Sequence, residues 1–286
     1  MSSKIAYQGE AGSNSNMACT ERYPDMEAVP CASFEDAFSL VETGEADLAM
    51  IPIENSLAGR VADIHVLLPE SDLKIVGEHY LRIRFDLLGL PGSSIEAATE
   101  VHSHVHALGQ CRKIIREYGL TPVIAGDTAG SAREVRDWQD PTKLSLAPPL
   151  AAELYGLDVL ASGVEDDQTN TTRFVVLARE HGIPARVALP DAVITTMVFQ
   201  ARNVPSALYK ALGGFATNGV NPTRMESYMV GSTFAATTFM VDIEGHPEDL
   251  PVRLALEELD FFTWEIKILG TYPASAHRKP LSASFV

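Results

Sequence analysis

The most concentrated group of polar side chains runs from Glu165 to Phe174 and leads directly into an apolar run, Val175–Leu177. Within it, Arg173 is a permanent cation that can clamp a carboxylate through two parallel hydrogen bonds, and Thr172 offers a hydroxyl beside it. Polar side chains at the mouth of a buried strand are typical of sites in α/β proteins. The same stretch also fits a simple polar turn with Asn170 as a cap, and local chemistry alone favours neither interpretation.

A second polar group, Glu54, Asn55 and Ser56, follows an apolar run and precedes Gly59, which permits a tight backbone. Asn55 and Ser56 can donate hydrogen bonds to an oxygen-rich ligand. They can also cap the next helix, and both roles can coexist at one helix N-terminus.

Two further segments combine small residues with a possible helix start. The loop Gly9–Ser15, which includes Gly12, can present backbone N–H groups to an anion, but its spacing fits no nucleotide-binding pattern, and a plain strand-to-helix turn is the alternative. In Asp127–Ala132, the hydroxyls of Thr128 and Ser131 either approach a ligand closely or belong to an ordinary capped helix.

Three histidines, His102, His104 and His106, alternate along the chain. On a strand they would point to one face in a row, yet metal sites usually draw on a distant ligand as well, and no acidic or cysteine partner is evident. We therefore expect no metal here and expect His104 to form hydrogen bonds or pack as a neutral residue.

Composition and charge exclude several classes of function. The chain has 286 residues and a formal net charge of −16, which argues against nucleic acid or an anionic membrane as a partner but not against an anionic substrate in a local cationic pocket. Cys19, Cys31 and Cys111 are scattered, which predicts neither a disulfide framework nor a zinc site. No apolar leader precedes the first strand, and no apolar run approaches the roughly 18 residues of a membrane span. We expect a cytoplasmic protein with reduced thiols.

The elements that would position these residues alternate in type. Short strands are predicted at 4–8, 28–31, 48–53, 100–102, 122–125, 144–147 and 173–178, and helices from Ser33 as an N-cap and at 107–118, 129–138 and 150–155. This rhythm predicts an α/β fold with parallel or mixed sheets covered by helices. A long apolar stretch at 73–90 and a second segment near 157–164 are interpreted as two crossovers between lobes, which would make a hinge with a ligand cleft.

The pattern changes after a proline-flanked linker at 185–191. Strands at 193–200, 222–228, 235–243 and 265–270 and helices at 206–215 and 249–259 follow in the order β-α-β-β-α-β, which is the ferredoxin-like arrangement.

Taken in order, these segments resemble the prephenate dehydratase family. The matching pieces are Ala6–Gly9 with Gly12, Asp47–Gly59, His104 with Ala107-Leu108 and Gln110-Cys111, Asp127–Ala129, Ala151–Leu157, and Asn170 with Thr172–Phe174. The resemblance implies a two-lobed catalytic region similar to type II periplasmic binding proteins. We place it at residues 1–184, with one lobe at about 1–80 and 160–184 and the other at about 81–159.

The same resemblance implies conversion of prephenate to phenylpyruvate, CO2 and water in L-phenylalanine biosynthesis, with no metal or organic cofactor. Thr172 would donate a proton to the departing hydroxyl. The implied catalytic residues are Thr172, Arg173, Asn55, Ser56 and Thr128, and the implied substrate-binding residues are Glu54, Asn170, Phe174, Gly12, Ser131 and His104.

The segment at 192–275 resembles an ACT domain, the phenylalanine-sensing module of this family, and 276–286 is predicted to be a flexible tail. The implied effector residues are Asn203, Pro205, Ser206, Ala207 and Leu208 in a first motif, where the family often has Gly at 206, and Glu226 and Ser227 in a second. Tyr228 and Met229 follow where Arg-Pro is usual. The resemblance further implies allosteric control by L-phenylalanine in a homodimer or homotetramer.

Three alternatives stay open at this point. The first is a sister enzyme that acts on arogenate, the aminated analogue. The second is a small-molecule binding protein without catalysis, and the third is an ACT-linked sensor of another protein, for which no basic DNA-reading helix is evident.

Overall fold

The computed structural model describes residues 3–179, 182–190, 192–202, 204–228 and 238–278. The chain divides into two compact units, residues 1–61 with 80–174 and residues 62–79 with 175–286. Two of the boundaries fall inside strands, one in β5 (Lys74–Arg82) and one in β11 (Thr171–Ala178).

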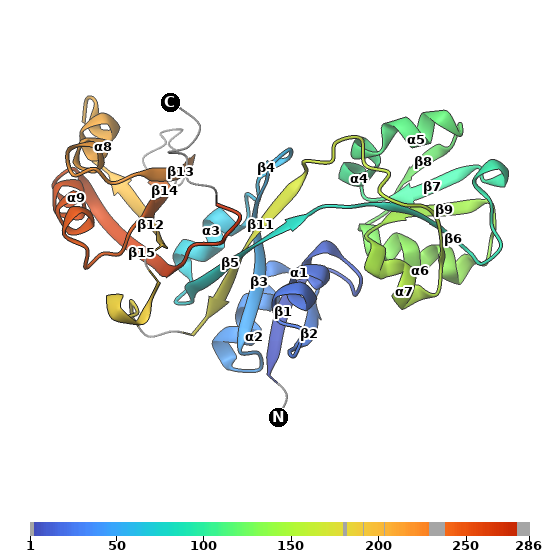
Figure 1. The fold of residues 1–286 in the computed structure, drawn as a ribbon, viewed down its shortest axis with the longest axis horizontal. Coiled ribbons are helices and arrows are strands. Elements are labelled where there is room, and N and C mark those ends of the chain that lie inside the picture. The colour runs from blue at the N-terminus through green and yellow to red at the C-terminus, as the bar shows by residue number, and fades with distance from the viewer. Residues whose placement is uncertain (1–2, 180–181, 191, 203, 229–237, 279–286) are drawn as a thin grey trace. The chain divides into compact units, whose positions relative to one another are not determined.

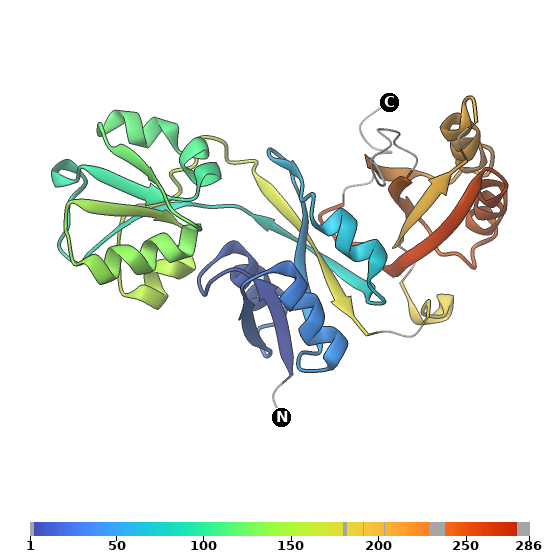
Figure 2. The ribbon, with the colours of Figure 1, turned by 180° about the vertical axis from the view of Figure 1, so that it is seen from behind.

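The first sheet has the strand order β2-β1-β3-β11-β5. Its other strands are β1 (Lys4–Gln8), β2 (Glu27–Cys31) and β3 (Leu48–Asn55), with the short β4 (Gly59–Arg60) paired to β3. β1 is parallel to both β2 and β3. The helices α1 (Asn14–Arg22) and α2 (Phe34–Thr43) lie beside β1, as Figure 2 shows. Ser33 and Asp36 form the reciprocal capping box that their spacing predicted for α2.

The second sheet has the order β10-β6-β9-β7-β8. Its strands are β6 (Asp86–Gly89), β7 (Glu100–Ser103), β8 (Thr121–Ile124), β9 (Lys143–Ala147) and β10 (Asp158–Ala161). A 3-10 turn, η1 (Ile95–Ala97), precedes β7. Helices α6 (Thr128–Trp138) and α7 (Pro149–Tyr155) lie on one side of the sheet, and α4 (Val105–Gln110) and α5 (Arg112–Glu117) lie on the other (Figure 1). The sheet is mixed, because β9 is parallel to β7 but antiparallel to β6.

Two chain segments connect these sheets and run side by side. One lies between β5 and β6, within the stretch 73–90 predicted as a crossover. The other lies at 162–170 and not at the predicted 157–164, because 158–161 form β10 of the second sheet. Ile83 N donates to Asn170 O at 2.9 Å, and Val164 N donates to Phe85 O at 2.9 Å. The buried carboxylate of Glu165 accepts hydrogen bonds from Phe85 N and from Arg82. The two crossover segments are therefore joined by backbone hydrogen bonds and by the buried carboxylate of Glu165.

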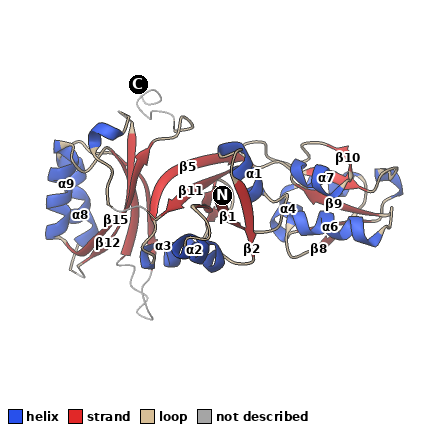
Figure 3. Cartoon of the chain, turned by 90° about the horizontal axis from the view of Figure 1, so that it is seen from below, coloured by secondary structure: helices blue, strands red, loops and turns tan. Residues whose placement is uncertain are grey.

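The third sheet has the order β13-β14-β12-β15 and is antiparallel throughout. Its elements follow the predicted order: β12 (Val193–Ala201), α8 (Ala207–Thr217), β13 (Pro222–Tyr228), β14 (Thr238–Glu244), α9 (Leu250–Phe261) and β15 (Thr263–Pro273). Figure 3 shows α8 and α9 together on one face of this sheet. The predicted fold class, a two-lobed α/β region followed by a ferredoxin-like βαββαβ domain, is confirmed.

The ferredoxin-like sheet packs closely on elements of its own unit that precede it in sequence. A Cβ atom on Gly270 would lie 2.1 Å from Ile75 O in β5, so only glycine fits there. Lys267 Nζ donates to the carbonyls of Pro69 and Ser71 at the end of α3 (Ile64–Glu70), at 2.6 and 2.9 Å.

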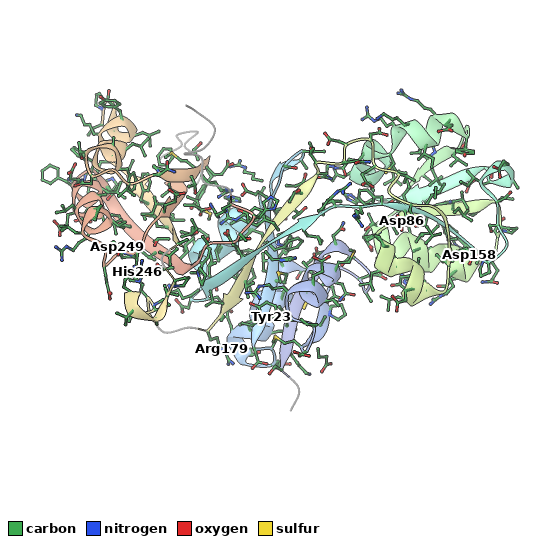
Figure 4. All side chains as sticks on the ribbon, viewed as in Figure 1. Tyr23, Asp86, Asp158, Arg179, His246 and Asp249 are labelled. Carbon is green, nitrogen blue, oxygen red and sulfur yellow. The ribbon has the colours of Figure 1, made fainter. Side chains whose placement is uncertain are left out.

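Two arginines fix segments that the sequence placed outside regular structure. In the linker, which contains the 3-10 turn η2 (Arg186–Ala188), Arg186 pairs with Asp249 at 3.0 Å. Asp249 also accepts a hydrogen bond from His246 N, and Figure 4 shows these two residues together. Within the predicted flexible tail, Arg278 bridges the carboxylates of Glu78 and Asp242, whose side chains are both 0% exposed.

Some predicted elements differ from the structure. The single helix expected at 107–118 is two helices, because Asp166 N donates to Gln110 O and the Asp166 carboxylate accepts from the N–H groups of Arg112 and Lys113 at the start of α5. Cys19, Cys31 and Cys111 are free and buried. In the part of the chain that the structure describes, no helix is long and apolar enough to span a bilayer.

Candidate active site

The end of β3 and the start of β11 are neighbours in the first sheet, which brings two of the polar groups of the sequence together. Ser56 N donates to Thr171 O at 2.9 Å, and Thr171 N donates back to Ser56 Oγ at 3.0 Å. Asn55 precedes Ser56 in the chain, and Thr172 follows Thr171, so these two residues also lie next to each other. Residues 115 or more positions apart in the chain thus meet at one edge of the fold.

The carboxamides of Asn55, Asn170 and Gln110 and the hydroxyl of Thr172 form a continuous hydrogen-bonded chain, which we call the amide chain. Asn55 Nδ2 donates to Asn170 Oδ1 at 2.7 Å and to Thr172 Oγ1 at 3.0 Å. Asn170 Nδ2 donates to Gln110 Oε1 at 2.7 Å. Gln110 comes from α4 beside the second sheet, so the amide chain joins the two lobes.

The direction of the amide chain is fixed by the backbone. Asn55 Oδ1 accepts from the N–H groups of Leu57 and Ala58 at 3.0 and 2.8 Å, which orients its Nδ2 toward Asn170 and Thr172. Thr172 Oγ1 is therefore an acceptor in this chain, and its own hydrogen has no partner among the described residues. The same holds for the Nε2 group of Gln110. Both ends of the amide chain thus offer free donors.

Arg173 and Glu54 form a separate pair. Successive side chains of a strand point to opposite faces. Accordingly Arg173, one residue after Thr172, is 2% exposed and pairs with Glu54 at 3.3 Å. Arg173 was expected to hold a substrate carboxylate beside Thr172. In the structure its guanidinium pairs with Glu54, another predicted site residue, and its role toward a substrate carboxylate stays a prediction.

The glycine-rich loop after β1 contacts the helices of the second lobe. A Cβ on Gly12, which has φ +86°, would lie 3.0 Å from Ala151 Cα, so the loop and α7 touch backbone to backbone. Arg133 of α6 makes two hydrogen bonds of 2.9 Å with the Glu10 carboxylate, and this pairing raises the pKa of Arg133 further. Tyr155 Oη donates to Ala11 O at 2.9 Å. This loop and the amide chain are two independent connections between the lobes.

Three other predicted site residues, the substrate-binding Ser131 and Phe174 and the catalytic Thr128, lie outside the amide chain. Ser131 is fully buried and its hydroxyl bonds Thr128 O and Ser145 Oγ, so it belongs to the core of its lobe. Thr128 is half-buried at the first position of α6, with Asp127 as the N-cap. Phe174 is 1% exposed and packs in the interior.

The three histidines do not share a strand face. His102 lies in β7, His104 is the N-cap of α4, and His106 lies inside α4. His104 Nδ1 accepts from His106 N, and burial together with the neighbouring His106 lowers the pKa of His104, which keeps it neutral near pH 7. No metal-binding group of three or more His, Cys, Asp or Glu side chains occurs in the described ranges.

The predicted effector motifs both lie in the ferredoxin-like domain. Asn203 is outside the described residues. Pro205 to Leu208 lead into α8, and Ser206 is its N-cap with φ +61°, a left-handed conformation that glycine adopts at lower cost. Glu226 and Ser227 lie on the edge strand β13.

Gln110 is the main site residue that the sequence-based reasoning did not assign. It was recognised as part of a matching motif, but its role depends on a contact with Asn170, 60 positions away. Nothing local marks that contact. Glu10 and Arg133 were missed for the same reason, because their pairing spans 123 positions.

Comparison with known proteins agrees with this geometry. A family model described as prephenate dehydratase matches residues 5–182. The chain belongs to the prephenate dehydratase family. The matched range contains every residue of the amide chain.

Three members or relatives of the prephenate dehydratase family align over nearly the whole chain. A bifunctional N-acyl-homoserine lactone acylase/prephenate dehydratase of Komagataeibacter europaeus is 50% identical over 276 residues, covering 96% of this chain and 97% of that protein. Arogenate dehydratase/prephenate dehydratase 2 of Arabidopsis thaliana is 37% identical, covering 94% and 72%. The crystal structure of prephenate dehydratase from Arthrobacter aurescens in complex with L-Phe superposes with a TM-score of 0.88 at 30% identity, covering 98% and 93%.

Proposed function

We propose that this protein converts prephenate to phenylpyruvate, CO2 and water, with Thr172 as the proton donor. One observation carries the proposal: Thr172 Oγ1 accepts a hydrogen bond from Asn55 Nδ2 at 3.0 Å, so that its own proton is directed elsewhere. A hydroxyl held in this way is prepared to donate to a substrate oxygen.

The reaction needs little more than one well-placed proton. In prephenate the ring carbon that bears the hydroxyl loses that group, and the ring carboxylate leaves as CO2. The electron pair of the breaking C–CO2 bond completes the aromatic ring, and the departing hydroxide takes the Thr172 proton to become water. The Thr172 oxygen then regains a proton from solvent, so each turnover consumes one proton. Protonation of the leaving oxygen lowers the barrier, because hydroxide is a poor leaving group.

A threonine hydroxyl is a weak acid, and the amide chain compensates for this. The Asn55 N–H that points at Oγ1 stabilises the negative charge that grows there as the proton departs. Asn170 and Gln110 hold Asn55 in that orientation. The free Nε2 donors of Gln110 can bind a second oxygen of the substrate, and Ser56 and Thr128 are further hydroxyl donors in this proposal.

Closure of the lobes belongs to the same mechanism. Gln110 reaches the amide chain from one lobe and Asn55 and Thr172 from the other, so the donors are complete only while the lobes are held together. The Glu10–Arg133 pair and the Tyr155 contact to Ala11 support that arrangement. Exclusion of water then strengthens each hydrogen bond to the substrate.

We further propose that residues 192–275 form an ACT domain through which L-phenylalanine controls a homodimeric or homotetrameric enzyme. The βαββαβ topology and the two motifs, before α8 and on β13, support this. The A. aurescens relative, described as a complex with L-Phe, lends it further support. The catalytic region would then be residues 1–184.

The direct test is to follow phenylpyruvate formation from prephenate, and phenylalanine formation from arogenate, with the full chain in the presence and absence of L-phenylalanine. We expect turnover of prephenate and a change in rate or affinity with L-phenylalanine. Faster turnover of arogenate than of prephenate would make arogenate the substrate. Binding of prephenate without turnover would show a binding protein without dehydratase activity.

A second candidate activity follows from one relative. The K. europaeus protein, 50% identical to this chain, is described as an N-acyl-homoserine lactone acylase as well as a prephenate dehydratase. We propose a parallel assay of this chain for the same activity: the same preparation is given an N-acyl-homoserine lactone, and release of homoserine lactone is measured. A Thr172→Val variant that loses dehydratase turnover but keeps acylase activity would place the two activities at different groups.

A further inference from the structure

Helices α4 and α5 follow each other in the chain and are interrupted at Cys111, which is buried between them. An α-helix that ran through this point would pair each backbone N–H with the carbonyl four positions earlier. The structure instead pairs three of these backbone groups with a single residue of the second crossover, Asp166. The interruption directly follows Gln110, a member of the amide chain.

Asp166 supplies the hydrogen bonds that the interruption removes. Its N–H donates to Gln110 O at 2.6 Å, where a continuous helix would use the N–H four positions later. Its two carboxylate oxygens accept from the N–H groups of Arg112 and Lys113, both at 3.0 Å. Cys111, the N-cap residue of α5, makes no side-chain hydrogen bond to the helix. The start of α5 is therefore capped from the crossover.

The same crossover segment holds Gln110 at two points. The carbonyl of Gln110 accepts from Asp166 N, and its side-chain Oε1 accepts from Asn170 Nδ2 at 2.7 Å. The segment between these two partners is itself fixed, because the Asp167 carboxylate accepts from Thr169 N and Oγ1 at 2.8 and 2.6 Å. The orientation of the Gln110 amide therefore depends on the backbone at residue 110, which Asp166 holds.

We propose that Asp166 is a positioning residue for the reaction, whose carboxylate keeps Gln110 at the end of α4 with its Nε2 donors directed to the substrate. This inference rests on the proposed function, in which those donors bind a substrate oxygen. Without the carboxylate, the N–H groups of Arg112 and Lys113 would regain partners by joining α4 and α5 into one helix. The carbonyl of Gln110 would then turn into that helix, and its side chain would leave Asn170.

The test compares Asp166→Ala, Gln110→Ala and the double variant in steady-state dehydration of prephenate by the full chain. Gln110→Ala should lower kcat/KM about 10- to 100-fold, because one hydrogen bond to a charged substrate is lost. Asp166→Ala should lose at least about threefold but no more than Gln110→Ala, because it acts only through that residue. The double variant should match Gln110→Ala within about threefold, whereas two independent roles would multiply the losses.

Two further variants separate positioning from a loss of stability. Asp166→Asn keeps one acceptor oxygen for the start of α5 and should recover part of the activity that Asp166→Ala loses. Asp36→Ala removes the carboxylate that accepts from Ser33 N at the start of α2, outside the proposed site. It should lower the midpoint of urea denaturation about as much as Asp166→Ala does, but it should leave kcat/KM unchanged.

A spectroscopic measurement reports the position of Gln110 without relying on turnover. In protein labelled with isotopic glutamine, the side-chain amide resonance of Gln110 is identified by its loss in Gln110→Ala. We expect Asp166→Ala to shift this resonance and Asp36→Ala to leave it in place. The proposal is overturned if the resonance does not move in Asp166→Ala, or if that variant keeps kcat/KM within about threefold of the wild type. It is also overturned if the double variant is more than about threefold less active than Gln110→Ala. A wild-type chain that does not turn over prephenate would refute the proposed function, and an unmoved resonance in Asp166→Ala would still overturn this inference.

Discussion

Replacing Asn55 by aspartate would reverse the direction of the amide chain while keeping its shape. The new carboxylate would still accept from the N–H groups of Leu57 and Ala58, as Asn55 Oδ1 does now. Its second oxygen would sit where Nδ2 now lies, 2.7 Å from Asn170 Oδ1 and 3.0 Å from Thr172 Oγ1. The amides of Asn170 and Gln110 can each turn over to restore donor-to-acceptor pairing. The Thr172 hydroxyl would then donate inward to the new carboxylate, away from a substrate.

The magnitude follows from the bonds that change. The hydroxyl would have to leave a charge-assisted hydrogen bond, worth about 1.5–3 kcal/mol, before it could serve as a donor. The N–H that stabilises Oγ1 would also be lost, at about 0.5–1.5 kcal/mol. Together these raise the barrier by about 2–4.5 kcal/mol, which lowers kcat by roughly 30- to 2,000-fold. Stability should change by only about 1 kcal/mol, because each contact keeps a partner.

The assay is steady-state formation of phenylpyruvate from prephenate by the wild type and Asn55→Asp, with urea denaturation of both. Asn221→Asp makes the same change at an exposed asparagine before β13, outside the proposed site, and is the control that should retain the turnover. A kcat for Asn55→Asp within threefold of the wild type, with an intact fold, would refute the idea that the direction of the amide chain matters. If the free energy of unfolding fell by as much as the activation barrier rose, the loss of kcat would be explained by unfolding of the variant and not by the direction of the amide chain.

Three predictions concern stability, each read from the midpoint of chemical denaturation. Ser206→Gly should stabilise the protein by about 1 kcal/mol, since residue 206 has φ +61°; no gain would mean that its side chain compensates for the conformation. Gly270→Ala should destabilise by about 2–3 kcal/mol, because the new Cβ meets Ile75 O; an unchanged midpoint would contradict that close packing. Arg278→Met should cost about 3–5 kcal/mol, because it removes the guanidinium that bridges two fully buried carboxylates, and a loss below about 1 kcal/mol would show that the segment is not anchored there.

The sequence predicted the elements of the fold well wherever local patterns determine them. The strand at 4–8 and the helix N-cap at Ser33 are properties of a few adjacent residues, and both are found where they were expected. The single helix expected at 107–118 is wrong, because its interruption is imposed by Asp166, which is more than 50 positions away. Local propensity contains no information about such a partner.

The sequence predicted several residues of the candidate site but not how they pair with one another. Asn55, Asn170 and Thr172 were singled out and do meet. The pairing of Arg173 with Glu54 was not predicted, because it depends on β3 and β11 being neighbours in the sheet. Strand order within a sheet is set by tertiary packing, which a single sequence does not encode locally.

The most direct test of the account is a comparison of Thr172→Val with Thr172→Ser in the dehydration of prephenate. Valine keeps the shape of threonine without the hydroxyl, and serine keeps the hydroxyl. We predict that Thr172→Ser retains kcat within about tenfold of the wild type, whereas Thr172→Val loses at least about a hundredfold with its fold intact. A Thr172→Val enzyme that still turns over prephenate within tenfold of the wild type would contradict the claim that this hydroxyl supplies the proton.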